Sequence, residues 1–169
     1  MSYAIVYDSR TGNTEALARA VAAALPSEGR LAFGRVDEVD RAAVAQADRV
    51  YAGFWTNRGD CGDELAEVLA SLADKDVFLF GTAGFGADET YFAGVMARVA
   101  VHLPESARIV GTFMCQGRMP ASVRARYAQT AEAKPEQAAR MHQLIENFDE
   151  AASHPDDDDL ARLREAVQA

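Results

Sequence analysis

Five short apolar runs alternate with longer segments in which apolar residues recur at helical spacing. The runs cover residues 3–6, 31–36, 49–54, 76–81 and 107–115. The run at 76–81 is almost entirely apolar, which is typical of a parallel strand covered on both faces, whereas polar residues interrupt the run at 31–36. The pattern therefore predicts five strands, with the second strand at an edge of the sheet.

The segments between these runs predict helices. Leu17, Val21 and Leu25 form one apolar stripe at the spacing i, i+4, i+8. Similar patterns predict helices at residues 13–25, 40–47, 63–72, around 92–99 and at 120–131. Strands that alternate with helices predict the α/β class, with a doubly wound five-stranded parallel sheet. Connection rules favour the strand order 2-1-3-4-5, with a ligand site outside the carboxyl ends of the strands, where the first and third strands lie side by side.

Two further helical patterns follow, at residues 135–152 and around 160–167. We expect a domain at residues 1–131 and extra C-terminal helices at 132–169 that pack on the same domain, although packing on a second subunit stays open. Pro155 and the aspartates at 156–159 precede the last pattern. Four carboxylates suit a divalent cation, but proline and acids at a helix N-terminus are ordinary capping chemistry, and we favour capping.

The polar turn at residues 7–14 joins the first strand to the first helix. A helix start carries unpaired N–H groups and positive potential, so it attracts anions. Ser9, Thr11 and Thr14 add three hydroxyls, and Gly12 allows a close approach of the backbone or a positive φ. A simple helix cap would use the same residue types. Three hydroxyls around a glycine favour a phosphate site.

The spacing of glycine and hydroxyl residues in the turn indicates the type of phosphate loop. The turn has neither the G-x-x-x-x-G-K-[ST] motif of nucleotide triphosphate loops nor the G-x-G-x-x-G motif of dinucleotide-binding folds. Its pattern [ST]-x-T-G-x-T resembles the FMN phosphate loop of the flavodoxin family. This resemblance implies a flavodoxin-like fold and non-covalently bound FMN. The residues expected to hold the FMN phosphate are Ser9, Arg10, Thr11, Gly12, Asn13 and Thr14.

The resemblance also implies two aromatic side chains around the flavin ring. Trp55, the only tryptophan, directly follows the third strand and is expected to stack on the ring, although it would also suit a core cap. Tyr91 is slightly preferred over Phe85 for the second face. The loops after the third and fourth strands supply the remaining expected contacts, which are Thr56, Asn57, Arg58, Gly59, Asp60, Thr82, Ala83 and Gly84.

Redox tuning is expected in the loop after the third strand. In flavodoxins a peptide of this loop can reorient towards the reduced flavin, and Gly59–Asp60 is the candidate here. Carboxylates at 60, 63, 64, 67, 88 and 89 predict an acidic rim that disfavours the second electron and steers a basic partner. Arg10 and Arg58 depart from the family pattern. Arg10 either pairs with the phosphate or points outward, and Arg58 would favour two-electron chemistry.

Composition limits the other possibilities. A formal charge of −9 argues against nucleic acid or an anionic membrane as a partner. Two cysteines and no signal peptide predict a cytoplasmic protein with reduced thiols; we expect Cys115 to be buried, and Cys61 lies in the flavin loop. The three histidines show no partner pattern, so we expect no metal site.

The sequence thus favours an FMN-binding electron-transfer protein that shuttles electrons between a reductase and a redox enzyme through the exposed flavin edge. Such a carrier, a monomer or a homodimer, has no catalytic residue in the usual sense. The alternative is an FMN-dependent NAD(P)H oxidoreductase that acts on quinone-like acceptors. A binding domain for another phosphate ligand is a third possibility.

Overall fold

The five predicted strands form a single parallel sheet. The computed structural model describes residues 1–86 and 88–169. The strand order is β2-β1-β3-β4-β5, which confirms the predicted doubly wound order and the edge position of the second strand. The strands are β1 (Tyr3–Tyr7), β2 (Arg30–Arg35), β3 (Arg49–Trp55), β4 (Asp76–Ala83) and β5 (Arg108–Gln116).

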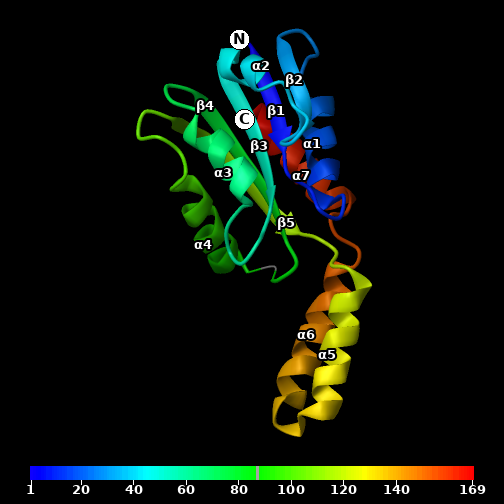
Figure 1. Ribbon diagram of the computed structural model, residues 1–169. Coiled ribbons are helices and arrows are strands. Elements are labelled where there is room, and N and C mark those ends of the chain that lie inside the picture. The colour runs from blue at the N-terminus through cyan, green and yellow to red at the C-terminus, as the bar shows by residue number, and fades with distance from the viewer. Residues whose placement is uncertain (87) are drawn as a thin grey trace.

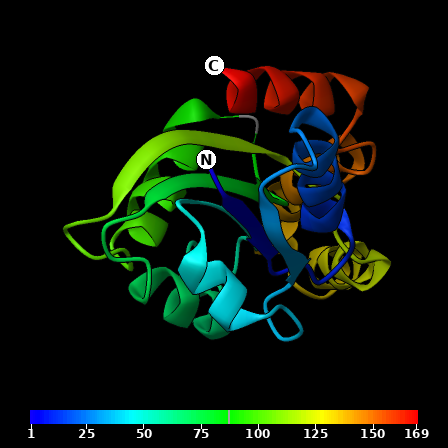
Figure 2. The same cartoon turned by 90° about the horizontal axis from the view of Figure 1, so that it is seen from above.

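Helices cover both faces of this sheet, as Figure 2 shows from above. The helices are α1 (Asn13–Ala24), α2 (Arg41–Gln46), α3 (Asp63–Ala70), α4 (Glu89–Ala100), α5 (Ala121–Ala133), α6 (Ala138–Ala151) and α7 (Asp157–Gln168), with a 3-10 turn η1 at Pro135–Gln137. One core cluster lies between the sheet and α2, α3 and α4, and the other lies between the sheet and α1 and α7. No helix in the described part of the chain has both the length and the hydrophobicity needed to cross a membrane.

The two central strands are held close by reciprocal pairs of glycine and phenylalanine. In the β3–β4 register Gly53 lies opposite Phe80, and Phe54 lies opposite Gly81. A methyl group on either glycine would overlap the ring of the paired phenylalanine. Both rings are fully buried. The glycines therefore make the space that these rings fill.

Replacing Gly81 tests this packing. We expect Gly81→Ala to lower the free energy of unfolding by about 1–3 kcal/mol, because the Phe54 ring or the backbone must move. Urea denaturation followed by far-UV circular dichroism measures the change. Gly94→Ala is the control: its new methyl group would meet nothing within 4 Å in the interior of α4, and we expect a gain of roughly 0.5–1 kcal/mol. Equal midpoints for the two variants would contradict the packing role.

The C-terminal helices fall into two groups. Leu163 and Val167 of α7 are buried in the core cluster that contains α1, so α7 forms part of the layered domain. In contrast, α5 and α6 pack against each other as a hairpin, which projects away from the sheet in Figure 1. The expected division at residue 131 lies within α5.

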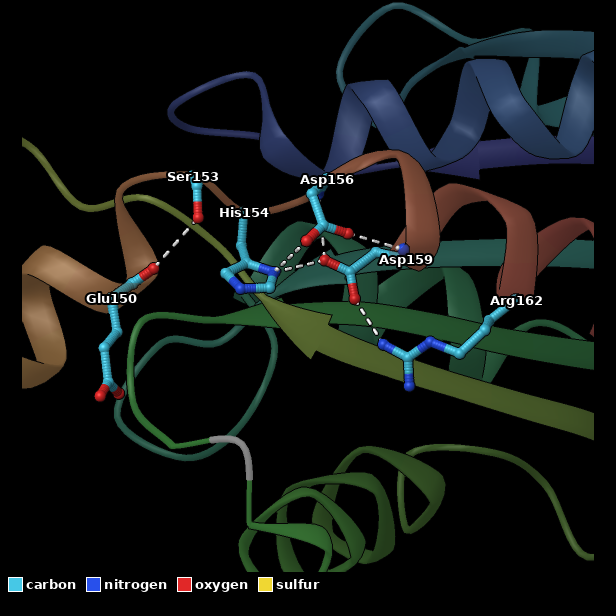
Figure 3. A network of polar contacts seen from close by, with 6 residues as sticks. All are labelled: Glu150, Ser153, His154, Asp156, Asp159 and Arg162. Carbon is cyan, nitrogen blue, oxygen red and sulfur yellow. Dashed lines mark hydrogen bonds and ion pairs between the residues drawn. The ribbon is translucent and has the colours of Figure 1, made fainter.

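A buried carboxylate links the hairpin to α7 (Figure 3). The side chain of Asp159 is 2% exposed; its Oδ2 lies 2.5 Å from His154 Nδ1, and its Oδ1 accepts a hydrogen bond from Arg162. Asp156 and Asp159 also form a reciprocal capping box at the start of α7, which confirms the capping interpretation of these aspartates. Burial by itself would raise the pKa of Asp159, but the hydrogen bonds from His154, the Asp156 amide and Arg162 outweigh it and lower that pKa. The network therefore contains a charged carboxylate.

Candidate functional site

A cavity of about 720 Å³ opens at the carboxyl edge of the sheet. The segments after β1, β3, β4 and β5 all contribute to its lining, at the edge where open α/β sheets bind ligands. The predicted site residues that line it are Arg10, Thr11, Asn13, Trp55, Thr56, Arg58, Gly59, Thr82, Ala83, Gly84, Phe85 and Tyr91. The other lining residues were not predicted from the sequence; they are Arg98, Gly117, Arg118, Met119, Pro120, Ser122, Val123 and Arg126.

The turn between β1 and α1 has the conformation expected of an anion loop. Gly12 is the N-cap residue of α1 and has a φ of 85°, a conformation that favours glycine. Of the three predicted hydroxyls, Thr11 lines the cavity. Ser9 is buried and its Oγ accepts a hydrogen bond from the Glu15 amide. Thr14 is fully buried and its hydroxyl lies 3.1 Å from that of Thr82. Ser9, Gly12 and Thr14 therefore shape the turn from outside the cavity lining.

Two buried oxygen atoms in the cavity lining have no hydrogen-bond partner among the described residues. Asn13 donates from Nδ2 to Thr11 Oγ1 and to the Arg118 carbonyl oxygen, which leaves its Oδ1 unpaired. Thr56 Oγ1 is likewise unpaired. An unsatisfied buried polar atom costs about 1–3 kcal/mol. Both atoms belong to residues of the cavity lining, and hydroxyl or N–H donors, such as the ribityl hydroxyls and ring N–H of a flavin, are the groups that pair with such oxygens.

The half-buried indole of Trp55 is fixed by two side chains near the first turn. Its Nε1 donates to Asp8 Oδ2 at 2.9 Å. The guanidinium carbon of Arg10 lies 5.5 Å from the centre of the ring, in a cation–π arrangement. Arg10 is exposed and lines the cavity, and whether it pairs with a phosphate stays a prediction. Asp8 gave no signal in the sequence because its role depends on a residue 47 positions away.

The loop after β3 folds into a tight turn that α4 holds in place. Asn57 and Asp60 exchange two backbone hydrogen bonds of 2.7 and 3.0 Å, and Arg58 and Gly59 between them have positive φ. Arg98 donates to the Gly59 carbonyl oxygen at 2.9 Å. Neither Asn57 nor Asp60 lines the cavity. The turn presents Arg58 and Gly59 to the cavity instead.

His102 has a side-chain partner, although the sequence showed no partner pattern for it. Its Nε2 lies 3.0 Å from Asp60 Oδ1. Since His102 and Arg98 are four residues apart, both reach the 57–60 turn from one side of α4 and its C-terminal end.

The loop after β4 is held by a side chain of the projecting hairpin. Asn147 of α6 accepts hydrogen bonds from the Gly86 amide and Gln116 Nε2, and it donates to the Gly84 carbonyl oxygen at 2.9 Å. Phe85, between the two glycines, is 41% exposed, whereas Tyr91 is partly buried against the core. Both line the cavity, so the choice of second ring partner stays open. Ala87 of this loop lies outside the described residues.

Removing the Asn147 side chain tests its hold on the loop. We expect Asn147→Ala to speed hydrogen exchange of the Gly86 amide by at least about fivefold, since a lost hydrogen bond is worth roughly 1 kcal/mol. Gln143→Ala, at an exposed position of α6, is the control and should leave the exchange unchanged. An unaltered Gly86 exchange rate in Asn147→Ala would show that the loop is held by other contacts.

Both cysteines are buried thiols. Burial and the neighbouring Asp60 carboxylate raise the pKa of Cys61 to about 12. Burial also raises the pKa of Cys115, whose burial confirms the sequence-based expectation. Both thiols are therefore protonated at neutral pH, which makes them poor nucleophiles.

The charge of the cavity differs from that of the whole chain. Five arginines line it, and no aspartate or glutamate does so among the described residues. Asp63 and Glu64, two members of the expected acidic rim, line a neighbouring depression together with Asp8 and Arg35. The cavity is thus basic although the chain carries a formal charge of −9.

The fold and the position of the cavity define a class of α/β proteins that bind ligands at the switch point of a 2-1-3-4-5 sheet. Comparison with known proteins identifies the family. A family model described as a flavodoxin domain matches residues 4–168. The flavodoxin-like domain-containing protein BilS of Clostridium symbiosum is 37% identical over 177 residues, which cover 97% of this chain and 93% of that protein. The chain therefore belongs to the flavodoxin family, whose members bind flavin.

Two further matches are more distant. BilS of Clostridioides difficile is 27% identical, over 95% of this chain and 90% of that protein. A flavoprotein from Lactobacillus acidophilus, solved in complex with FMN, shares the fold with a TM-score of 0.51 and 12% identity, over 67% of this chain and 92% of that one.

Proposed function

We propose that this protein is an FMN-binding electron carrier that passes electrons between a reductase and a redox enzyme through the flavin edge. The observation that carries the proposal is the pair of unpaired buried oxygens, Asn13 Oδ1 and Thr56 Oγ1, in the cavity at the switch point of a flavodoxin fold. An apolar ligand would leave both atoms unsatisfied. A flavin has hydrogen-bond donors for these two oxygens, and it has a flat ring that suits the cavity.

Different residues of the chain would contact the phosphate and the ring of FMN. Thr11, Asn13 and the amides at the start of α1 would hold the phosphate and its adjoining hydroxyls. Trp55 and either Tyr91 or Phe85 would contact the ring faces. When bound, FMN supplies the one- and two-electron chemistry, and the protein supplies position and electrostatics.

The 57–60 turn is the element expected to tune the flavin. Because Arg98 holds the Gly59 carbonyl oxygen, reorientation of the Gly59–Asp60 peptide would have to break that hydrogen bond. The free energy needed to break this hydrogen bond would change the relative stability of the one- and two-electron-reduced forms of the flavin. Carboxylates near the start of α3, such as Asp63 and Glu64, lie beside the cavity and would steer a basic partner protein. A cytoplasmic location stays a prediction.

A second function is favoured by one specific observation. Five arginines around the cavity would suit the phosphates of a nicotinamide dinucleotide, as expected for an FMN-dependent NAD(P)H oxidoreductase acting on quinone-like acceptors. In such an enzyme the electron donor NAD(P)H would bind directly to the protein, so no separate reductase would be needed.

An anaerobic reductive titration separates the two functions. The FMN-loaded protein is titrated with dithionite and, in parallel, with NADPH or NADH alone, and absorbance spectra are recorded. For a carrier we expect a one-electron-reduced form to accumulate to a large fraction, with negligible oxidation of NAD(P)H. Direct passage to the two-electron-reduced form with rapid consumption of NAD(P)H would refute the carrier. Failure to bind FMN after reconstitution would refute both functions.

Thr56→Val tests the site itself. Valine has nearly the shape of threonine but lacks the unpaired hydroxyl, so the flavin-free variant should be as stable as the wild type or more stable. FMN binding should weaken by roughly three- to tenfold, since one hydrogen bond is lost. Thermal melting and quenching of FMN fluorescence measure the two effects.

Thr112→Val is the matched control, because Thr112 is an exposed residue of β5 outside the cavity lining. We expect its FMN affinity to equal that of the wild type. An undiminished FMN affinity in Thr56→Val would remove the Thr56 hydroxyl from the flavin site.

A further inference from the structure

The arginines of the cavity lack the carboxylate partners that six of the ten other arginines of the chain have. Six arginines elsewhere form ion pairs with aspartate or glutamate; they are Arg19, Arg35, Arg49, Arg108, Arg124 and Arg162. Among the described residues, none of the five cavity arginines forms one; these are Arg10, Arg58, Arg98, Arg118 and Arg126. Positive charge that is left uncompensated in a concave site concentrates anions there.

This charge exceeds what one FMN molecule would neutralise. A phosphate monoester carries about two negative charges at neutral pH. Arg10 and Arg58 belong to loops already expected to contact FMN, whereas Arg98, Arg118 and Arg126 come from α4, the segment after β5 and α5. Arg98 reaches the 57–60 turn, and the Arg118 carbonyl oxygen accepts a hydrogen bond from Asn13. Arg126 is the arginine that lines the cavity from the hairpin, outside the three expected flavin loops.

The walls beside these arginines are apolar. Met119, Pro120 and Val123 line the cavity from the start of the hairpin, next to Arg118 and Arg126 in the sequence. Guanidinium groups bind carboxylate, sulfonate or phosphate oxygens in a bidentate manner. Apolar walls with guanidinium groups among them suit an organic anion with a flat body better than an inorganic anion.

We propose that the cavity binds a second ligand beside the flavin, a flat organic molecule with at least two anionic groups, and that Arg126 on the hairpin is one of the residues that recognise it. The proposal rests on the proposed function only in that FMN occupies the other part of the cavity.

Equilibrium dialysis of the FMN-loaded protein against anthraquinone-2,6-disulfonate tests the proposal, with 2-hydroxymethylanthraquinone as the uncharged analogue. We expect the dianion to bind and the uncharged analogue to bind at least about tenfold more weakly, because charge-assisted hydrogen bonds are lost. Raising the ionic strength should weaken binding of the dianion alone.

Two variants remove the same charge from the same hairpin. Arg126→Gln should weaken binding of the dianion about fivefold to tenfold. Arg140→Gln, at an exposed position of α6 outside the cavity and without an ion pair among the described residues, should change it by less than about twofold, as expected for a distant screened charge. Equal effects of the two variants, or equal binding of the charged and uncharged probes, would overturn the proposal.

The same measurement on flavin-free protein separates this proposal from the proposed function. Dianion binding that FMN abolishes would mean a single anion site and would overturn the second-ligand proposal. If FMN does not bind at all, the proposed function fails, and Arg126-dependent dianion binding to the free protein would still support an anion site. Competition by NADPH with the same dependence on Arg126 would support the proposal and identify nucleotide phosphates as the anion; dianion binding that NADPH leaves unchanged would support a non-nucleotide anion.

Discussion

The close contact between β3 and β4 is the constraint on which the site depends. Gly53 and Gly81 leave room for the rings of Phe80 and Phe54, so the two strands stay in register up to their carboxyl ends. The chain leaves the sheet directly beyond these pairs, where the Thr56 amide donates to the Thr82 carbonyl oxygen at 2.8 Å. The floor of the cavity is therefore an extension of these closely packed strands, and this rigid support preorganises the cavity for a ligand.

The edges of the cavity are built differently, from elements that are distant in the sequence. Arg98 holds the turn after β3 from α4, and Asn147 holds the loop after β4 from α6. The His154 carbonyl oxygen accepts a hydrogen bond from the Arg118 amide, so the base of the hairpin is tied to a residue of the cavity lining. The buried Asp159 network fixes that base against α7. The hairpin is thus connected to the site by hydrogen bonds although it projects from the domain (Figure 1).

Charge is segregated over this small protein. The chain as a whole is acidic, yet the cavity contains arginines without carboxylates in its described lining. An acidic surface disfavours anionic macromolecules, while a basic cavity attracts small anions that fit inside it. This arrangement is compatible with a carrier that receives a basic partner on its surface and with an oxidoreductase that admits an anionic substrate.

The sequence by itself determined the strand order and most of the loop residues that line the cavity after β1, β3 and β4, because these depend on local signals such as periodicity, glycine and residues at strand ends. It did not determine which hydroxyls face the cavity: Thr11 lines the cavity, whereas the hydroxyl of Thr14 lies against that of Thr82 in the core, since the rotation of α1 decides this. Arg98, Arg126 and Asn147 could not be predicted either. They are polar residues on helices, indistinguishable in sequence from any solvated position, and only the packing of those helices brings them to the site.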